Sequence, residues 1–272
     1  MRPNCSTGAA CYHRRRLRLL SSNPSKRWME LFVLAYSPVW IGIITYCEVT
    51  RVFAHWGDLG HLAFGLALAA PVWLIPLAFP GAADRGIPLL SRHATRFNVF
   101  IAVWTFVQVW FGSDLFFDFL GMEYHFPVTW TAHRTPLFLY PVTIAYFSTY
   151  YVLMQIIWRA FLTRFPSAPL PLRIIVLVII GYAVAFTETS GMATDVMHEY
   201  FRYRDKSFTL LYGSLCYGTI FVVSLPLVYR LDENAQPDGQ RTIRSLLWDA
   251  CAANTIVLIF YAVYASFITH PR

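Results

Sequence analysis

Charged residues are scarce in this chain of 272 residues. Only 14% of its residues are charged, whereas 57% are apolar and 17% are aromatic. A soluble domain carries roughly 25% charged residues, so this chain has too few charges to cover a water-facing surface of its size. The composition therefore excludes an ordinary soluble globule and predicts a protein that lies in a lipid bilayer.

A concentrated basic patch is also missing, although the net charge is +7. The lysine and arginine residues are dispersed between apolar runs. This dispersion is typical of the loops of a membrane protein, and it gives no reason to expect a nucleic-acid partner. We expect membrane lipid around the chain instead.

Motifs that hold cofactors or metals are absent as well. The sequence has no Gly-rich phosphate loop and no Ser-centred nucleophile elbow, and no two of its eight histidines stand three or four residues apart. We therefore expect no cofactor and no metal, which disfavours redox, hydrolytic and nucleotide-driven enzymes. The cysteines are odd in number and lack metal-ligand spacing: Cys5, Cys11, Cys47, Cys216 and Cys251.

Long apolar runs are what the sequence does contain. A helix needs roughly 20 residues to cross the hydrocarbon core, and backbone groups in lipid must be satisfied within the segment, so each run should be a helix. The pattern predicts an all-α polytopic membrane bundle of about seven transmembrane helices. The runs lie at about 30–47, 59–79, 97–117, 137–161, 172–190, 207–229 and 246–268.

The charges between these runs predict an orientation. With the N-terminus in the cytoplasm, 16 of the 22 lysine and arginine residues lie on the cytoplasmic side, as the positive-inside rule expects. Residues 1–24 are rich in arginine and lack acidic residues, so we expect a disordered cytoplasmic tail before a helical domain at 25–272. A transit peptide is the alternative for this tail. If the source is eukaryotic, we expect the endoplasmic reticulum.

A few acidic residues fall near membrane depth. Glu188 directly follows the apolar run 174–187, and an ionisable residue inside a membrane is costly and often functional. A carboxyl group among apolar side chains favours its neutral form, which a proton donor requires. Glu30 opens the first run, and Asp114 lies at the far end of the third. For these residues an ordinary place at the membrane interface is the alternative.

Five short motifs resemble a known family. They are SKRWMEL at 25–31, ADR at 83–85, GMEYHFP at 121–127, FTET at 186–189 and SLPLVYRLDE at 224–233. In this order and spacing they resemble the cycloeucalenol cycloisomerases, and the similarity runs from about residue 23 into the last apolar run. The resemblance implies a sterol isomerase that opens the cyclopropane ring of cycloeucalenol to give obtusifoliol without redox change. The chain differs from the plant members at Asp114, where they have a histidine.

The implied chemistry requires an acid, a base and a dry pocket. The acid protonates the strained ring at its bridging methylene, and aromatic faces stabilise the resulting cation until a base removes a neighbouring proton. We expect Glu188 to be the proton donor or acceptor. Its second-rank partners are Asp114, Tyr124 and Glu30, and the candidates for the wall of the substrate pocket are Trp110, Phe116, Phe117 and Tyr212.

Two other functions fit the same sequence features. One is another membrane sterol isomerase that moves a ring double bond, because it too would use buried acids without a cofactor. The other is a non-catalytic seven-helix protein that binds or transports lipid, or a seven-helix receptor. The predicted cytoplasmic N-terminus is opposite to the usual orientation of such receptors.

Overall fold

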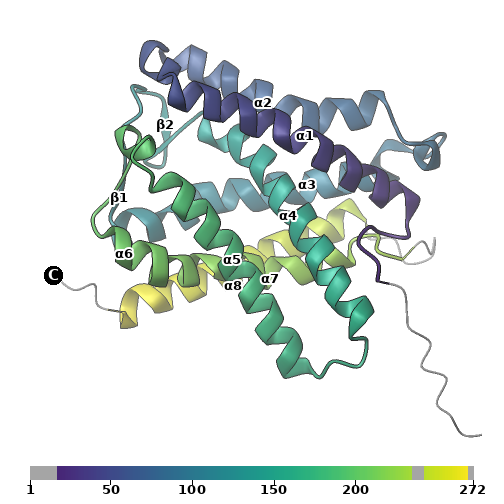
Figure 1. Ribbon diagram of the computed structural model, residues 1–272. Coiled ribbons are helices and arrows are strands. Elements are labelled where there is room, and N and C mark those ends of the chain that lie inside the picture. Colours follow the sequence, from purple (N-terminus) through teal and green to yellow (C-terminus); the bar gives the residue numbers. More distant parts are fainter. Residues whose placement is uncertain (1–16, 235–241, 269–272) are drawn as a thin grey trace, which may run out of the picture.

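The computed structural model describes residues 17–234 and 242–268, and most of these residues lie in helices (Figure 1). This confirms the prediction of an all-α bundle. The long helices are α1 (Pro24–Val49), α2 (Asp58–Ala78), α3 (His93–Val107), α4 (Leu139–Arg164), α5 (Leu170–Met192), α7 (Ser214–Arg230) and α8 (Ile243–Phe267). A short helix α6 (Lys206–Phe208) precedes α7.

Each of the seven apolar runs forms a helix, and six of these helices are long and apolar enough to cross a membrane. The run predicted at 137–161 is α4, the one long helix in the described part of the chain outside that group of six. Its 26 residues span about 39 Å, so its length suffices. Figure 1 shows α4 crossing the centre of the bundle. Because its neighbours bury Ser148, Gln155 and Arg159, α4 can be more polar than the lipid-facing helices.

The helix next to the candidate site does not end as a regular α-helix. After α3 the chain continues in two π turns, at Gln108–Gly112 and Leu115–Phe119, and a third π turn at Thr209–Gly213 precedes α7. Such turns occur frequently at functional sites because they rotate the side chains that follow them. Here the first turn is fixed by a 2.6 Å hydrogen bond from Gln108 to Asn254 of α8.

Short strands cover one end of the bundle. Strand β1 (Met122–Tyr124) pairs antiparallel with β4 (Phe201–Tyr203), and Tyr124 stands opposite Phe201. A second pair is formed by β2 (Thr131–Ala132) and β3 (Thr135–Pro136). In Figure 1 the labels β1, β2 and α6 lie together at this end. We call this group of strands the cap.

A buried ionic cluster lies at the end of the bundle away from the cap, near the start of α1 and the end of α4. Arg159 of α4 binds Glu30 of α1 at 2.6 Å and Glu233, which follows α7, also at 2.6 Å. Lys26 donates to the last carbonyl groups of α7, including Tyr229 at 2.7 Å, and lies 3.1 Å from Glu233. Burial alone would raise the pKa of Glu233, but Arg159 and Lys26 outweigh it and hold the pKa below its ordinary value. The cluster thus ties α1, α4 and α7 together.

The same cluster continues to α3 and to the chain before α1. Asp232 binds His93 at 2.9 Å and Arg96 at 3.0 Å. Ser21 is buried, and its backbone N–H donates to Glu30 at 2.9 Å. Of the predicted tail at 1–24, residues 1–16 lie outside the described residues, whereas Ser21 shows that the remainder packs on the bundle before α1 begins at Pro24.

Candidate active site

A large cavity of about 810 Å³ lies between α1, α4, α5 and the cap. Ligand pockets typically have volumes of about 300–1,000 Å³, so this cavity has room for a lipid-sized molecule. Most of its wall is apolar and comes from Trp40, Ile41 and Ile44 of α1, Val142, Leu153 and Ile157 of α4, and Ile179, Ile180, Ala183 and Val184 of α5. Its carboxyl groups belong to Glu48 and Glu188.

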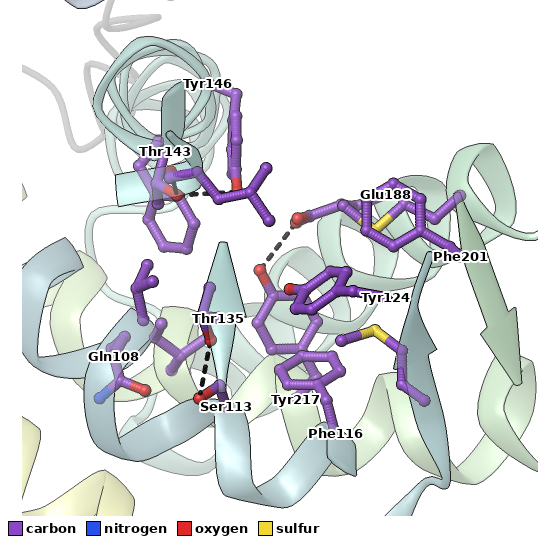
Figure 2. A pocket seen from close by; sticks show the side chains of 16 residues that line it. Gln108, Ser113, Phe116, Tyr124, Thr135, Thr143, Tyr146, Glu188, Phe201 and Tyr217 are labelled. Atoms are coloured by element: carbon purple, nitrogen blue, oxygen red, sulfur yellow. Dashed lines mark hydrogen bonds between the residues drawn. The ribbon is translucent and has the colours of Figure 1, made fainter. Parts of the chain in front are cut away.

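A small pocket of about 80 Å³ adjoins the large cavity at Glu188. Both spaces share Leu139, Tyr146, Glu188, Met192 and Phe201 in their walls. Beyond these, the small pocket has apolar walls from Val109, Phe116, Met122, Phe147 and Ile220. It also carries hydroxyl and amide groups from Gln108, Ser113, Tyr124, Thr135, Thr143 and Tyr217 (Figure 2). Glu188 therefore lies where the large cavity meets a small pocket whose walls combine apolar side chains with hydroxyl and amide groups.

The carboxyl group of Glu188 is held by one hydrogen bond from a neighbouring helix. The Tyr217 hydroxyl of α7 donates to Oε2 of Glu188 at 2.8 Å, as Figure 2 shows. The ring of Tyr217 stands edge-on against Phe116, with the ring centroids 4.9 Å apart. The other oxygen, Oε1, accepts no hydrogen bond from a described residue, so a neutral Glu188 can present its proton to a ligand from that side.

A close approach of two helices makes this hydrogen bond possible. Helix α5 meets α7 at Gly181 and Gly218, where a Cβ on Gly181 would lie 2.8 Å from the Gly218 carbonyl oxygen. Small residues allow membrane helices to pack this closely. Tyr217 directly precedes Gly218 in the sequence, so the glycine contact fixes the distance across which Tyr217 reaches Glu188.

Tyr124 enters the small pocket from the cap. Strand β1 carries it, and its ring stands edge-on against Phe117 at 5.4 Å and against Phe201 at 5.3 Å. Burial, together with the nearby charge of Glu188, raises the pKa of the Tyr124 phenol well above its usual value. Tyr124 therefore remains a protonated hydroxyl that can donate but does not ionise near neutral pH.

The structure brings some of the predicted site residues together. Glu188, Tyr124 and Phe116 all line the small pocket, and Glu188 also lines the large cavity. Phe117 is buried and lines neither space. Its ring packs against Tyr124 and, at 4.5 Å, against the Arg134 guanidinium. Phe117 is thus a support for Tyr124.

Other predicted residues lie elsewhere. Asp114 faces the cap and accepts hydrogen bonds from His133 at 3.1 and 3.2 Å. The indole of Trp110 stacks on His133 at 5.7 Å. Tyr212 is 58% exposed, and Glu30 belongs to the buried ionic cluster. None of these four side chains lines the cavity or the small pocket.

Sequence reasoning missed two functional candidates. Tyr217 is a tyrosine inside an apolar run, and sequence alone does not show that it faces Glu188. Glu48 stands at the end of the first apolar run as Glu188 stands at the end of the fifth. In alternating spans these two ends lie on the same side of the membrane, which is the signal that could have paired them.

The described residues show no metal-binding arrangement. Within 17–234 and 242–268, no three His, Cys, Asp or Glu side chains come together in a way that could hold an ion. The chemistry that the described site itself offers is proton transfer between a carboxyl group, tyrosine hydroxyls and a ligand in the cavity.

Comparison with known proteins gives one relevant similarity. The chain is 30% identical over 259 residues to the cycloeucalenol cycloisomerase of Arabidopsis thaliana, which covers 92% of this chain and 89% of that protein. No family model matches the sequence. No solved structure matches it either.

Proposed function

Because this chain belongs to the cycloeucalenol cycloisomerase family, we propose that it is a membrane sterol isomerase that converts a cycloeucalenol-type sterol into obtusifoliol. The observation that carries the proposal is the position of Glu188 between the large apolar cavity and the small pocket that contains the hydroxyl groups of Tyr124 and Tyr217. A rigid hydrocarbon substrate fits the first space, and a proton donor must stand at its wall.

The first chemical step is proton transfer from Glu188. The carboxyl proton adds to the bridging methylene of the cyclopropane, one C–C bond of the three-membered ring breaks, and the methylene becomes a methyl group. Positive charge then develops on the adjacent ring carbon. The hydrogen bond from Tyr217 to Oε2 stabilises the carboxylate that forms, because a donor aimed at developing charge favours the transition state.

The second step removes a proton from a neighbouring ring carbon and leaves a ring double bond. The carboxylate of Glu188 accepts this proton, so the enzyme returns to its starting state with no net gain or loss of protons. Between the two steps the cation requires aromatic faces and the exclusion of water. Tyr146, Tyr150 and Phe201 line the large cavity near Glu188 and supply such faces.

Substrate access follows from the membrane setting. Ile41, Leu153, Ile157 and Ile179 line the cavity and are exposed apolar residues. A sterol dissolved in the bilayer therefore meets an apolar entrance between α1, α4 and α5. We place the N-terminus in the cytoplasm and the end of the bundle with the ionic cluster on the cytoplasmic side of the membrane. In a eukaryotic cell we place the protein in the endoplasmic reticulum.

The test is sterol profiling in yeast cells that express the chain and are supplied with cycloeucalenol. We expect obtusifoliol from the natural chain and none from Glu188→Gln, with equal amounts of both proteins in the membrane. Glu123→Gln is the matched control, because Glu123 lies on the cap with its side chain 70% exposed. Normal turnover by Glu188→Gln would contradict the proposed role of Glu188.

The same cells separate the two alternative functions. If the protein is a double-bond isomerase, it will leave cycloeucalenol intact and convert a simple sterol with a ring double bond. If it is a lipid-binding or transport protein, cycloeucalenol will bind to purified protein without conversion.

A further inference from the structure

Glu48 is the second acid of the large cavity, and the mechanism above does not use it. It lies in the last turn of α1, and its neighbour Thr45 lines the same cavity. Residues three apart share one face of a helix, so the two polar groups face the cavity together. The side chain of Glu48 forms no hydrogen bond or ion pair with any described residue, although its backbone carbonyl accepts from the Arg51 N–H at 3.1 Å. A carboxyl group that faces a cavity without a partner among the described residues is suited to receive one from a ligand.

The cavity has a polar end and an apolar end. Helices α1 and α4 run antiparallel, because Glu30 meets Arg159 and Ser37 meets Thr149 at 2.8 Å. Continuing this register brings Glu48 to the start of α4, near the cap. Leu139, at that start, also lines the small pocket with Glu188. The two carboxyl groups therefore lie toward the same end of the cavity.

The opposite end is formed by aliphatic side chains. Ile157 of α4 and Ile179 of α5 line it. Along α4, Val142 and Ile157 both line the cavity and are separated by about 22 Å of helix rise. The space is thus elongated, with the two acids toward one end and Ile157 and Ile179 at the other.

A sterol has the same distribution of polarity. It carries one hydroxyl group on ring A and an apolar tail at the other end, and in a cyclopropyl sterol the three-membered ring lies at the junction next to ring A. We propose that Glu48 binds the ring-A hydroxyl of the substrate by accepting its hydrogen bond. The tail then extends toward Ile157 and Ile179, and the cyclopropane is held at the end of the cavity that contains Glu188. The identity of the substrate here rests on the proposed function.

The experiment compares cycloeucalenol with its 3-O-methyl ether, which has no hydrogen-bond donor. Binding and turnover of both are measured with purified protein in phospholipid nanodiscs. For the natural chain we expect binding of the alcohol to be about fivefold tighter or more, because the ether loses the hydrogen bond that the alcohol donates to the carboxyl group. Glu48→Leu should reduce this preference to about twofold or less.

Two further variants make the result specific. Glu48→Gln keeps the shape of the side chain and a neutral acceptor, so it should retain an intermediate preference and serves if Glu48→Leu does not fold. Glu123→Leu removes an acid outside the cavity and should keep the full preference.

The outcomes separate this inference from the proposed function. An unchanged preference in both Glu48 variants overturns the assignment. Loss of turnover with both substrates at unchanged binding preference also overturns it and makes Glu48 an acid or base of the reaction. If the natural chain converts neither substrate, the proposed function fails, whereas the binding preference still decides whether Glu48 recognises the hydroxyl group.

Discussion

The hydroxyl group of Tyr217 donates a 2.8 Å hydrogen bond to Oε2 of Glu188 across the contact between α5 and α7. This pair connects the two features that define the site. Glu188 lines both the apolar cavity and the small pocket, whereas Tyr217 lines the small pocket alone. The bond leaves Oε1 free to act on a ligand and stabilises negative charge on the carboxylate after proton transfer.

Tyr217→Phe removes this bond and keeps the aromatic ring against Phe116. We expect the turnover number to fall by about tenfold to a hundredfold, because a hydrogen bond to a charged group contributes about 1.5–3 kcal/mol. The Michaelis constant should change little, since Tyr217 acts on the carboxylate and not on the bound sterol. Tyr212→Phe, at a 58% exposed position, is the control. An unchanged turnover number in Tyr217→Phe would remove this bond from the mechanism.

Gly181→Ala tests whether the helix contact sets the geometry of the site. The added Cβ would lie 2.8 Å from the Gly218 carbonyl oxygen, so α5 must move away from α7. We expect a loss of about 1–3 kcal/mol in stability, as for other overpacked sites, and a lower turnover number because Tyr217 no longer reaches Glu188. Thermal unfolding in detergent and sterol conversion measure the two effects. Gly42→Ala is the control, since a Cβ there meets no atom within 4 Å.

The helices were predictable because a long apolar run that crosses a lipid bilayer on its own must form a helix. Backbone groups without water must bond within the segment, so each of the seven runs became a helix. The polarity of α4 depends instead on its position. Its run contains Gln155 and extends to Arg159, which only the surrounding helices make tolerable, and a sequence does not show which helix lies at the centre.

The family motifs separate into two groups in the structure. Lys26 and Glu30 of SKRWMEL meet Glu233 of SLPLVYRLDE in the ionic cluster, whereas Tyr124 of GMEYHFP and Glu188 of FTET meet in the small pocket. Reading the sequence could not separate these groups, because an acid in a buried ion pair and an acid in a cavity occupy similar apolar runs. Glu188 was found because an uninterrupted apolar run precedes it. Glu30 was grouped with it because it opens the first apolar run, but it lies in the ionic cluster.

Asp114→Asn tests whether Asp114 takes part in the reaction or only forms ion pairs on the cap. Its carboxylate is paired with His133 at 3.1 Å, lies 3.7 Å from Arg134 and lines neither the cavity nor the small pocket. An exposed ion pair contributes little, at about 0–1 kcal/mol. We therefore expect turnover within about fivefold of the natural chain, since at most this small energy is lost. A loss as large as that of Glu188→Gln would return Asp114 to the reaction, as the sequence suggested.

Arg159→Met removes the centre of the ionic cluster. Glu30 and Glu233 then remain buried without their main partner, and breaking a buried pair on one side costs about 3–5 kcal/mol. We expect a large drop in the midpoint of thermal unfolding in detergent and little folded protein. Arg164→Met is the control, because Arg164 ends the same helix at an exposed position. Equal midpoints for both variants would show that the cluster does not stabilise the bundle.

The pH dependence of stability follows from Asp232. Burial alone would raise the pKa of its carboxyl group, but the hydrogen bond from His93 and the charges of His93, Arg96 and Lys26 hold the pKa below the ordinary value. A group whose pKa is lower in the folded state stabilises the fold above its unfolded pKa, near 4 for aspartate. That stabilisation disappears as the pH falls through the folded pKa.

We therefore expect the free energy of unfolding to decline below about pH 4 and the decline to be shallower in Asp232→Asn. Asp195→Asn is the control, because Asp195 is exposed and makes no ion pair with a described residue. Unfolding midpoints in detergent between neutral pH and about pH 3 measure both slopes. Asparagine still accepts from Arg96, so this variant should fold and isolate the charge. If Asp232→Asn and the natural chain lose stability in parallel, the Asp232 carboxylate does not carry the acid sensitivity of the cluster.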